Sequence, residues 1–349
     1  HQAGFSQTSG PNNTNIGYKA GYSNTTEDSR TIVGYECGEF STGSDNTYMG
    51  RRAGRGSSGQ TNSGLRNTAI GAVAGQFITT GAENTFLGFQ AGQLNQTASN
   101  NTFIGARAAA SANVTGGDNT GIGNLALAFL SSGTKNTVLG YQAGDAITTS
   151  SDNTFIGSGS GTSANASGTN GKNTGVGRSA LSDLTSGINN TSMGYNSAPS
   201  LSSGSNNVMI GYQADVSTGA ASNQNSFGYS ASCSANNQVT LGNSSISALR
   251  CAVTSITSLS DERDKSEIKN LEYGLAFIDS LQPREFVWNN RVETNKDGEE
   301  FYSSNKGKKD FGFIAQEVKE LDNDTLRLVY DENPEKLELS YGKLVPVLV

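Results

Sequence analysis

A short template recurs through the first two-thirds of the chain at an almost constant interval. Its clearest copies read Asn-Thr-x-aliphatic-Gly, and successive template glycines stand about 17 residues apart. These glycines are residues 17, 34, 50, 71, 88, 105, 123, 140, 157, 177, 194, 211, 228 and 242. So regular a period argues against disorder and predicts a solenoid, in which each repeat forms one coil of a stack.

The template also indicates how each coil turns and what it buries. The chain is 34% hydrophobic and contains 44 glycines, so it cannot build a thick globular core. Adjacent strand residues point to opposite faces, which predicts two buried faces per coil. We expect the aliphatic residue before each template glycine and the alanine three residues after it to point inward, with glycines at positive-φ corners. Stacked Asn and Thr side chains are expected to form hydrogen-bonded ladders.

A single roll of this kind would bury little apolar surface. Each coil offers about two modest side chains, worth roughly 1 to 3 kcal/mol apiece. We therefore predict a mainly β fold, a parallel β-roll or solenoid in which several chains pack along one axis. A homotrimer is the natural closure, although the sequence does not distinguish three chains from two. A monomeric β-solenoid is the alternative.

Charge divides the chain near residue 260. Residues 261–349 hold 13 of the 24 Lys and Arg residues and 20 of the 31 Asp and Glu residues, which leaves 11 of each for the rest. We predict a repetitive fibre and receptor-binding domain over 1–242, a junction over 243–259 and a smaller α+β domain over 260–349. Neither part is basic and no run of about 18 apolar residues occurs, so we expect neither nucleic-acid binding nor membrane insertion.

Residue types of common active sites are scarce. The only histidine is His1, which argues against a Ser-His-Asp triad or a His-based zinc site. Cys37, Cys233 and Cys251 are scattered and form no C-x-x-C pair, so we expect no disulfide framework, no metal and no cofactor. The sequence opens with neither Met nor a charged-then-apolar leader, and we expect it to be a fragment of a longer protein.

Two interruptions of the period are candidate receptor-binding loops. The interval from Gly50 to Gly71 has 21 residues and that from Gly157 to Gly177 has 20, and both carry polar insertions that we expect to bulge. The aromatic residues that often follow a template glycine form a second candidate surface, since aromatic rings stack on sugars. The competing interpretation is that these rings pack against the next coil. The candidate receptor contacts are Arg55, Gln60, Asn62, Asn165, Asn170, Tyr141 and Tyr212.

The C-terminal part loses the period and has the pattern of ordinary helices and strands. Apolar residues at three- and four-residue steps predict an amphipathic helix over 266–281, stopped before Pro283. A strand is expected over 284–288, a polar turn over 295–309, and a strand running into a helix over 311–321.

The hexad at the domain boundary has two interpretations. By spacing alone, Ser260-Asp261-Glu262-Arg263-Asp264-Lys265 is a helix N-cap followed by a charged first turn. It also resembles the S-D-x-R-x-K signature of the peptidase S74 family, an intramolecular chaperone found at the C-termini of phage tail fibres and tailspikes and in some eukaryotic membrane-bound transcription factors. Further matches follow in the family's order: IKNL at 268–271, LQP at 281–283 with Phe286 and Trp288, FGFIAQEV at 311–318, and Tyr341 with LVPVL at 344–348.

This resemblance implies a chaperone that assembles a trimer and then cuts itself off at the Leu259–Ser260 bond. It assigns Ser260 as the nucleophile and Lys265 as its base, with Asp261 and Arg263 orienting the site. A Ser-Lys dyad suits a chain without a usable histidine, because a desolvated lysine can accept the serine proton. The family's pattern continues past Val349 into a long helix, so we expect that helix to be truncated here.

The repeats resemble the head repeats of trimeric autotransporter adhesins over residues 12–242, through their strand-plus-glycine template. This second resemblance implies a parallel β-roll in a homotrimer. Because such coils can slip by one repeat, a trimeric C-terminal clamp would fix the register of the chains. Cleavage after assembly would then make unfolding irreversible.

Together these patterns predict a homotrimeric phage tail fibre or tailspike that binds a host cell-surface receptor, either a glycan or an outer-membrane protein. We expect it in the virion tail, after assembly in the host cytoplasm. One alternative is a bacterial trimeric surface adhesin with the same chaperone. Another is a capsule depolymerase tailspike, although no paired carboxylates recur at a spacing typical of glycoside hydrolysis.

Overall fold

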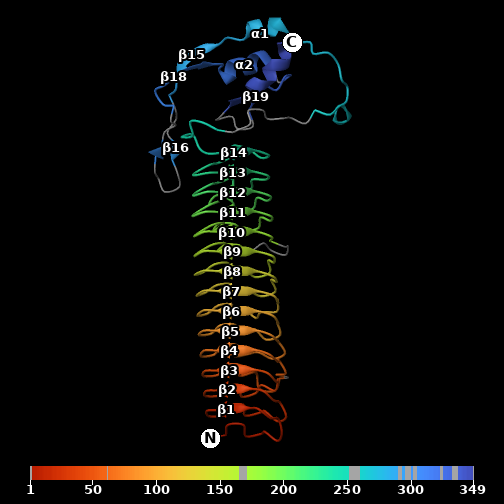
Figure 1. The fold of residues 1–349 in the computed structure, drawn as a ribbon, viewed down its shortest axis with the longest axis vertical. Helices are drawn as coiled ribbons and strands as arrows, with labels where there is room; N and C mark the ends of the chain where they lie inside the picture. Colours follow the sequence, from red (N-terminus) through yellow and green to blue (C-terminus); the bar gives the residue numbers. More distant parts are fainter. Residues whose placement is uncertain are drawn as a thin grey trace. The chain divides into compact units, whose positions relative to one another are not determined.

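The computed structural model divides into two compact units, His1–Leu241 and Gly242–Val349. In the first unit, fourteen strands stack in sequence order (Figure 1). The structure describes residues 2–60, 62–164, 171–250, 260–289, 293–294, 300–301, 305–322, 325–331 and 337–348. No helix among these residues is long and apolar enough to cross a membrane.

The fourteen strands of the first unit have three residues each and form one parallel sheet. Their bounds are β1 (Thr14–Ile16), β2 (Thr31–Val33), β3 (Thr47–Met49), β4 (Thr68–Ile70), β5 (Thr85–Leu87), β6 (Thr102–Ile104), β7 (Thr120–Ile122), β8 (Thr137–Leu139), β9 (Thr154–Ile156), β10 (Thr174–Val176), β11 (Thr191–Met193), β12 (Val208–Ile210), β13 (Asn225–Phe227) and β14 (Val239–Leu241).

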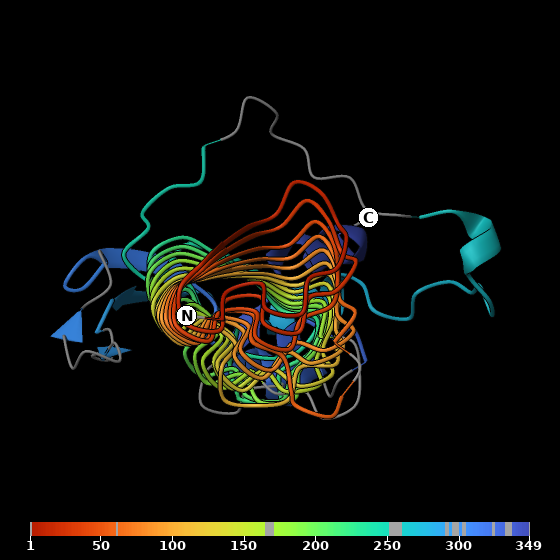
Figure 2. The same cartoon turned by 90° about the horizontal axis from the view of Figure 1, so that it is seen from below.

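Neighbouring strands pair so that equivalent template residues lie side by side. Thr102 pairs with Thr120. Thr47 pairs with Thr68 across the longest interval, so the inserted residues are accommodated outside the sheet. Seen along the stack, successive coils follow closely similar paths (Figure 2). The predicted parallel solenoid is confirmed.

The middle residue of each strand faces the interior, and the residue before the glycine does not. Phe86, Phe103 and Phe155 are fully buried, whereas Leu87 is 43% exposed and Ile16 is 59% exposed. The prediction that the aliphatic residue before each template glycine points inward is therefore wrong. Strand side chains alternate, so once the middle residue of a three-residue strand faces inward, both of its neighbours face outward.

The rest of each coil completes the interior. The alanines three residues after a template glycine, such as Ala53 and Ala91, are buried as predicted. Leu130 and Ile147, which lie beyond the strands, join them in one continuous core. Only one of the two predicted buried faces is therefore covered within the single chain.

The template asparagines form the predicted ladder through the interior. The backbone N–H and Nδ2 of Asn84 each donate to Asn67 Oδ1 at 3.0 Å, and Nδ2 also donates to the Ala98 carbonyl at 2.9 Å. Threonine hydroxyls outside the template also join the coils by donating to a backbone carbonyl of the next coil, as Thr79 does to Gln96 at 3.0 Å. The template asparagines of one coil are thus bonded to those of the coil beside it.

The template glycines occupy the expected positive-φ corners. Gly88 has a φ of +134°, and a Cβ at this position would lie 2.6 Å from the Gly105 carbonyl oxygen in the next coil. Both the left-handed backbone and the close approach of neighbouring coils therefore require glycine.

The second unit is a small α+β arrangement. Strand β15 pairs antiparallel with β18, β16 with β17, and β19 with β20. Its elements are η1 (Glu262–Asp264), α1 (Leu275–Ser280), β15 (Arg284–Val287), β16 (Glu293–Thr294), β17 (Glu300–Phe301), β18 (Lys309–Gly312), α2 (Ala315–Asp322), β19 (Val329–Tyr330), β20 (Glu338–Leu339) and η2 (Tyr341–Val347).

The helix predicted over 266–281 is much shorter in the structure. Only Leu275–Ser280 is helical, and the expected apolar residues Ile268 and Leu271 are 67% and 49% exposed. Helices of this length depend on packing of their apolar face, and no described residue buries these two side chains. Of residues 295–309 the structure describes 300–301 and 305–309, and it places β17 and the start of β18 there, so the prediction of a polar turn is wrong in part. Strand β15 confirms the strand predicted over 284–288. Strand β18 followed by helix α2 confirms the strand and helix predicted over 311–321.

Candidate functional site

Ser260 and Lys265 lie against each other near the predicted domain boundary. Lys265 Nζ is 2.6 Å from Ser260 Oγ and 3.1 Å from the Ser260 carbonyl oxygen. The structure thus brings together the two residues that the sequence predicts as nucleophile and base. Leu259, the other residue of the predicted cleavage bond, lies outside the described residues.

A single helical turn, η1, holds this pair together. Asp261 is its N-cap and accepts a hydrogen bond from the Arg263 backbone N–H at 2.9 Å. The Lys265 N–H closes the turn by donating to the Glu262 carbonyl at 3.0 Å. The N-cap that the hexad predicts is therefore present, but it caps one 3-10 turn. That turn returns Lys265 to the vicinity of Ser260.

Asp261 and Arg263 form an ion pair across the same turn. Arg263 donates from Nη2 to Asp261 Oδ2 at 2.6 Å and from Nε to Oδ1 at 3.0 Å. The side-chain hydrogen bonds from Arg263, together with its backbone N–H, lower the pKa of Asp261. The same side-chain bonds raise the pKa of Arg263. Both groups are therefore ionised at neutral pH, which suits holding the turn better than transferring protons.

All four signature side chains are exposed in the single chain. An amine acts as a base only through a free lone pair, because a protonated ammonium group can only donate hydrogen bonds. The geometry therefore supplies contact between a hydroxyl and an amine, and the amine must be shielded from solvent before it can act as a base.

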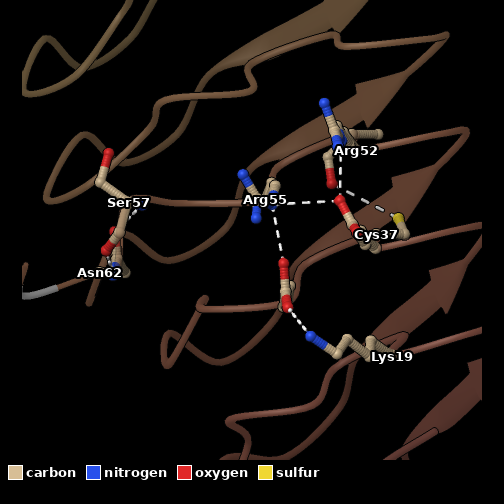
Figure 3. Close-up of polar contacts among 9 residues, drawn as sticks. Lys19, Cys37, Arg52, Arg55, Ser57 and Asn62 are labelled. Carbon is tan, nitrogen blue, oxygen red and sulfur yellow. Dashed lines mark hydrogen bonds and ion pairs between the residues drawn. The ribbon is translucent and has the colours of Figure 1, made fainter. Parts of the chain in front are cut away.

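Arg55, a predicted receptor contact, is engaged within the solenoid. Its Nε lies 2.8 Å from Glu39 Oε2 and 3.6 Å from Glu36 Oε2. Lys19 binds the second Glu39 oxygen at 2.9 Å, and Arg52 binds Glu36 at 2.7 Å (Figure 3). These five residues form an ion cluster that joins three successive coils.

The sequence reasoning missed this ion cluster. Glu36 and Arg52 both stand two residues after a template glycine, so superposing the coils would have revealed the opposite charges. Burial tends to raise the pKa of Glu36, but hydrogen bonds from Arg52 and Tyr35 outweigh it and lower that pKa overall. The hydrogen bond and charge of Glu39 raise the pKa of Lys19.

Asn62 closes the loop that bulges from the longest interval. Its Oδ1 accepts a hydrogen bond from the Ser57 N–H at 2.9 Å (Figure 3). Its Nδ2 donates to the Ser57 carbonyl at 2.8 Å and to the Gln60 carbonyl at 2.9 Å. Asn62 is 5% exposed, whereas Ser58, Gly59 and Gln60 are exposed. The predicted bulge is confirmed here, and Gln60 is the predicted contact that reaches solvent.

The remaining receptor candidates fall into two groups. Asn165 and Asn170 lie outside the described residues. Tyr141 is 54% exposed and Tyr212 is 38% exposed. The Tyr212 ring stacks between Tyr195 and Tyr229 with centroid distances of 5.3 and 5.4 Å, as the packing interpretation of these rings predicts. None of these contacts tests receptor binding, which stays a prediction.

The described residues include no group of three or more His, Cys, Asp or Glu side chains that could hold a metal ion. Cys37 and Cys233 are free and buried, and burial raises the pKa of the Cys37 thiol to about 12. Cys37 is therefore not placed to act as a nucleophile, because a thiol must ionise to react. Cys251 lies outside the described residues.

Comparison with known protein families matches the segment that begins at Ser260. No curated protein is significantly similar to the chain. Residues 260–327 match the Peptidase_S74 family, described as chaperone of endosialidase, and this confirms the identification from the signature residues. The match does not extend into the repeats, whose resemblance to adhesin heads stays a prediction. Proteins of this family are self-cleaving intramolecular chaperones, and such a segment behind a β-solenoid fits a trimeric fibre- or tailspike-like protein.

Proposed function

We propose that the protein is a homotrimeric phage tail fibre or tailspike whose C-terminal segment is an intramolecular chaperone that releases itself by cutting the Leu259–Ser260 bond. The match over residues 260–327 and the solenoid in front of it support the chaperone and the fibre. The contact of 2.6 Å between Lys265 Nζ and Ser260 Oγ is the observation that carries the cleavage step.

The cleavage is an acyl shift followed by hydrolysis. Deprotonated Lys265 takes the proton from Ser260 Oγ, and Oγ attacks the carbonyl carbon of the preceding residue. The C–N bond breaks, the Ser260 nitrogen receives the proton from Lys265, and an ester to Ser260 Oγ remains. Water then hydrolyses the ester, which leaves a carboxylate on residue 259 and regenerates the serine hydroxyl. Water is the only co-reactant.

Assembly supplies the condition that the single chain lacks. Ser260 and Lys265 are both exposed to solvent in one chain. Packing against neighbouring chains would remove water from Lys265 and favour its neutral form. Cleavage is thereby delayed until the trimer has formed. Asp261 and Arg263 hold the turn through their ion pair and act as positioning residues.

Substitution of the two reacting residues tests this cleavage. Ser260→Ala and Lys265→Ala should leave the chain intact on a denaturing gel. The native protein should instead yield a fragment that ends at residue 259, as its mass will show. Ser266→Ala and Lys269→Ala are matched controls, because both residues are exposed and neighbour the hexad. Intact native protein, or cleavage that survives Ser260→Ala, would overturn the dyad.

Receptor binding belongs to the solenoid in this proposal. The exposed tip around Gln60 and the exposed ring of Tyr141 present polar and aromatic groups of the kind that bind glycans or an outer-membrane protein. The mature fibre would stand in the virion tail after assembly in the host cytoplasm. Gln60→Ala and Tyr141→Ala should weaken binding of the fibre to host cells. Asn223→Ala, another exposed polar position, serves as the control. Unchanged binding in both variants would remove these residues from the receptor site.

A further inference from the structure

The outward-facing side of the solenoid sheet carries a continuous apolar row. The third residue of every strand is large and apolar, and none of these residues is buried; Ile210 is 37% exposed and Leu241 is 55% exposed. The row consists of Ile16, Val33, Met49, Ile70, Leu87, Ile104, Ile122, Leu139, Ile156, Val176, Met193, Ile210, Phe227 and Leu241.

This exposed row is more strictly apolar than the buried one beside it. Inside the solenoid, the middle strand position is occupied by Gly121, Gly175, Ser192 and Ser226 as well as by large residues. The outward third position contains no glycine and no polar residue. Apolar character is normally most constant where side chains are hidden from water. In this solenoid the exposed row is the more constantly apolar of the two, which indicates that the outer row is hidden in the assembled protein.

The rows on either side keep the surface narrow and uncharged. The first strand residue is threonine except in the last three strands, and a template glycine follows the third residue in each coil. We call these three rows the outer strip, and none of them contains a charged residue. A parallel sheet is ordinarily covered on both faces. In this sheet the coil covers the inner face and leaves the outer face bare.

The outer strip is large enough to hold chains together. Fourteen strands about 4.8 Å apart span about 62 Å, and three strand residues are about 10 Å wide, so the strip covers about 600 Å². Exposed rings that border it, such as Tyr35, Phe89 and Tyr141, extend the apolar surface. A stable interface buries about 800 Å² on each partner, which is comparable.

We propose that the outer strip is the contact surface between parallel copies of this chain, with equivalent coils at the same height. This inference rests on the proposed trimer and names the face that forms it. A second copy fits because it presents the same strip with the same axial repeat, which an unrelated globular partner does not. The parallel direction follows from the chaperone segments, which must meet at one end to act together.

Crosslinking of the full chain tests the face. Leu139→Cys and Ser58→Cys are each made in a Cys251→Ser background, where the other two cysteines, Cys37 and Cys233, are buried. With a short bismaleimide, Leu139→Cys should give covalently joined chains at least about tenfold more than the solvent-facing control Ser58→Cys. Joining at Ser58→Cys and not at Leu139→Cys would overturn the assignment.

A charge on the strip gives an independent reading. Leu139→Asp should lower the assembly mass threefold in light scattering while circular dichroism still reports the β-solenoid, and Ser58→Asp should leave the mass unchanged. A Leu139→Asp protein that stays trimeric would overturn the face and leave the proposed function standing. A native protein with the mass of one chain would instead overturn the trimer, and the inferred face with it.

Discussion

The solenoid and the C-terminal unit bury their apolar residues to different extents. In the solenoid, most core side chains are fully buried and form one continuous cluster. Among the described residues of the C-terminal unit, seven form the core, and Phe277 and Leu344 within it are still 9% exposed. Outside that core, Phe311 is 82% exposed and Leu275 is 68% exposed.

The difference shows which parts of the molecule are complete in one chain. A coil is closed by the coils beside it, through the asparagine ladder and the inward middle residues. The C-terminal unit leaves several apolar residues exposed, including Phe311, Trp288 and Val345. Exposed apolar residues of this kind have the character of a contact surface, which suits the proposed chaperone role.

The largest effect on stability should come from a buried apolar residue of the solenoid, in contrast to an exposed apolar residue of the C-terminal unit. Phe86 is fully buried and its ring stacks on Phe103 at 5.7 Å, so Phe86→Ala should lower the free energy of unfolding of the solenoid by about 3 to 5 kcal/mol. Phe311→Ala should change the stability of the unassembled chain little but should reduce trimer yield. Urea denaturation and light scattering give the two readings. Equal losses of stability in Phe86→Ala and Phe311→Ala would contradict the difference in burial between the two units.

Removal of one rung of the asparagine ladder should have the next largest effect. Asn136 Nδ2 donates to Asn119 Oδ1 at 3.0 Å and to the Ser150 carbonyl at 3.0 Å, and its Oδ1 accepts from Asn153. Asn136→Ala leaves these buried partners unsatisfied and should cost about 2 to 4 kcal/mol in urea denaturation. Glu317→Gln breaks the exposed ion pair with Arg284 in the C-terminal unit and should have no measurable effect. A larger loss of stability in Glu317→Gln than in Asn136→Ala would contradict the stabilising role of the ladder.

Replacing Arg30, which interrupts the asparagine ladder in the early coils, with asparagine should stabilise the solenoid. Arg30 stands at the ladder position and is 1% exposed, and its guanidinium nitrogens have no hydrogen-bond partner among the described residues. Burial lowers the pKa of Arg30, which reflects the cost of the enclosed charge. Arg30→Asn should raise the free energy of unfolding by about 1 to 3 kcal/mol. Exposed Arg51→Asn is the control, and destabilisation by Arg30→Asn would show that the guanidinium is satisfied in solution.

The smallest effect is the response of the ion cluster to acid. Because the pKa of Glu36 is lowered from its ordinary value of 4.5, the stabilisation is fully present above that value and is lost as pH falls through the lowered one. Glu36→Gln should therefore remove up to about 1 kcal/mol of the stability difference between neutral pH and about pH 3. Glu83→Gln, in the exposed pair with Arg66, should leave the profile unchanged. Identical profiles for the native protein and Glu36→Gln would show that the cluster does not contribute.

The sequence predicted the solenoid well because its template repeats the same local constraints in every coil. Gly88 and its equivalents need positive φ, and Asn84 and its equivalents need stacked partners, so both features are visible without a structure. The inward direction was not predictable, because alternation separates Phe86 from Leu87 but does not say which of them faces the core. That choice depends on how the corners fold the rest of the coil back.

The C-terminal unit was less predictable because its apolar pattern does not describe one chain alone. The spacing of Ile268 and Leu271 indicates a helix, yet both residues are exposed in the part of the single chain that the structure describes. The pairing of Ser260 with Lys265 came from the family resemblance, and its geometry depends on the one-turn helix η1. The ion cluster of Glu36 and Arg52 was accessible by superposing coils, since the contact follows from the repeat itself.

Refolding tests most directly whether the C-terminal segment assembles the solenoid. The uncleaved Ser260→Ala chain and a chain of residues 1–259 would be denatured, diluted into buffer at the same concentration and weighed by light scattering. The uncleaved chain should recover trimers in high yield, while the chain that ends at residue 259 should give mainly monomers and misaligned aggregates. Equal recovery of correctly aligned trimers from both chains would contradict the account.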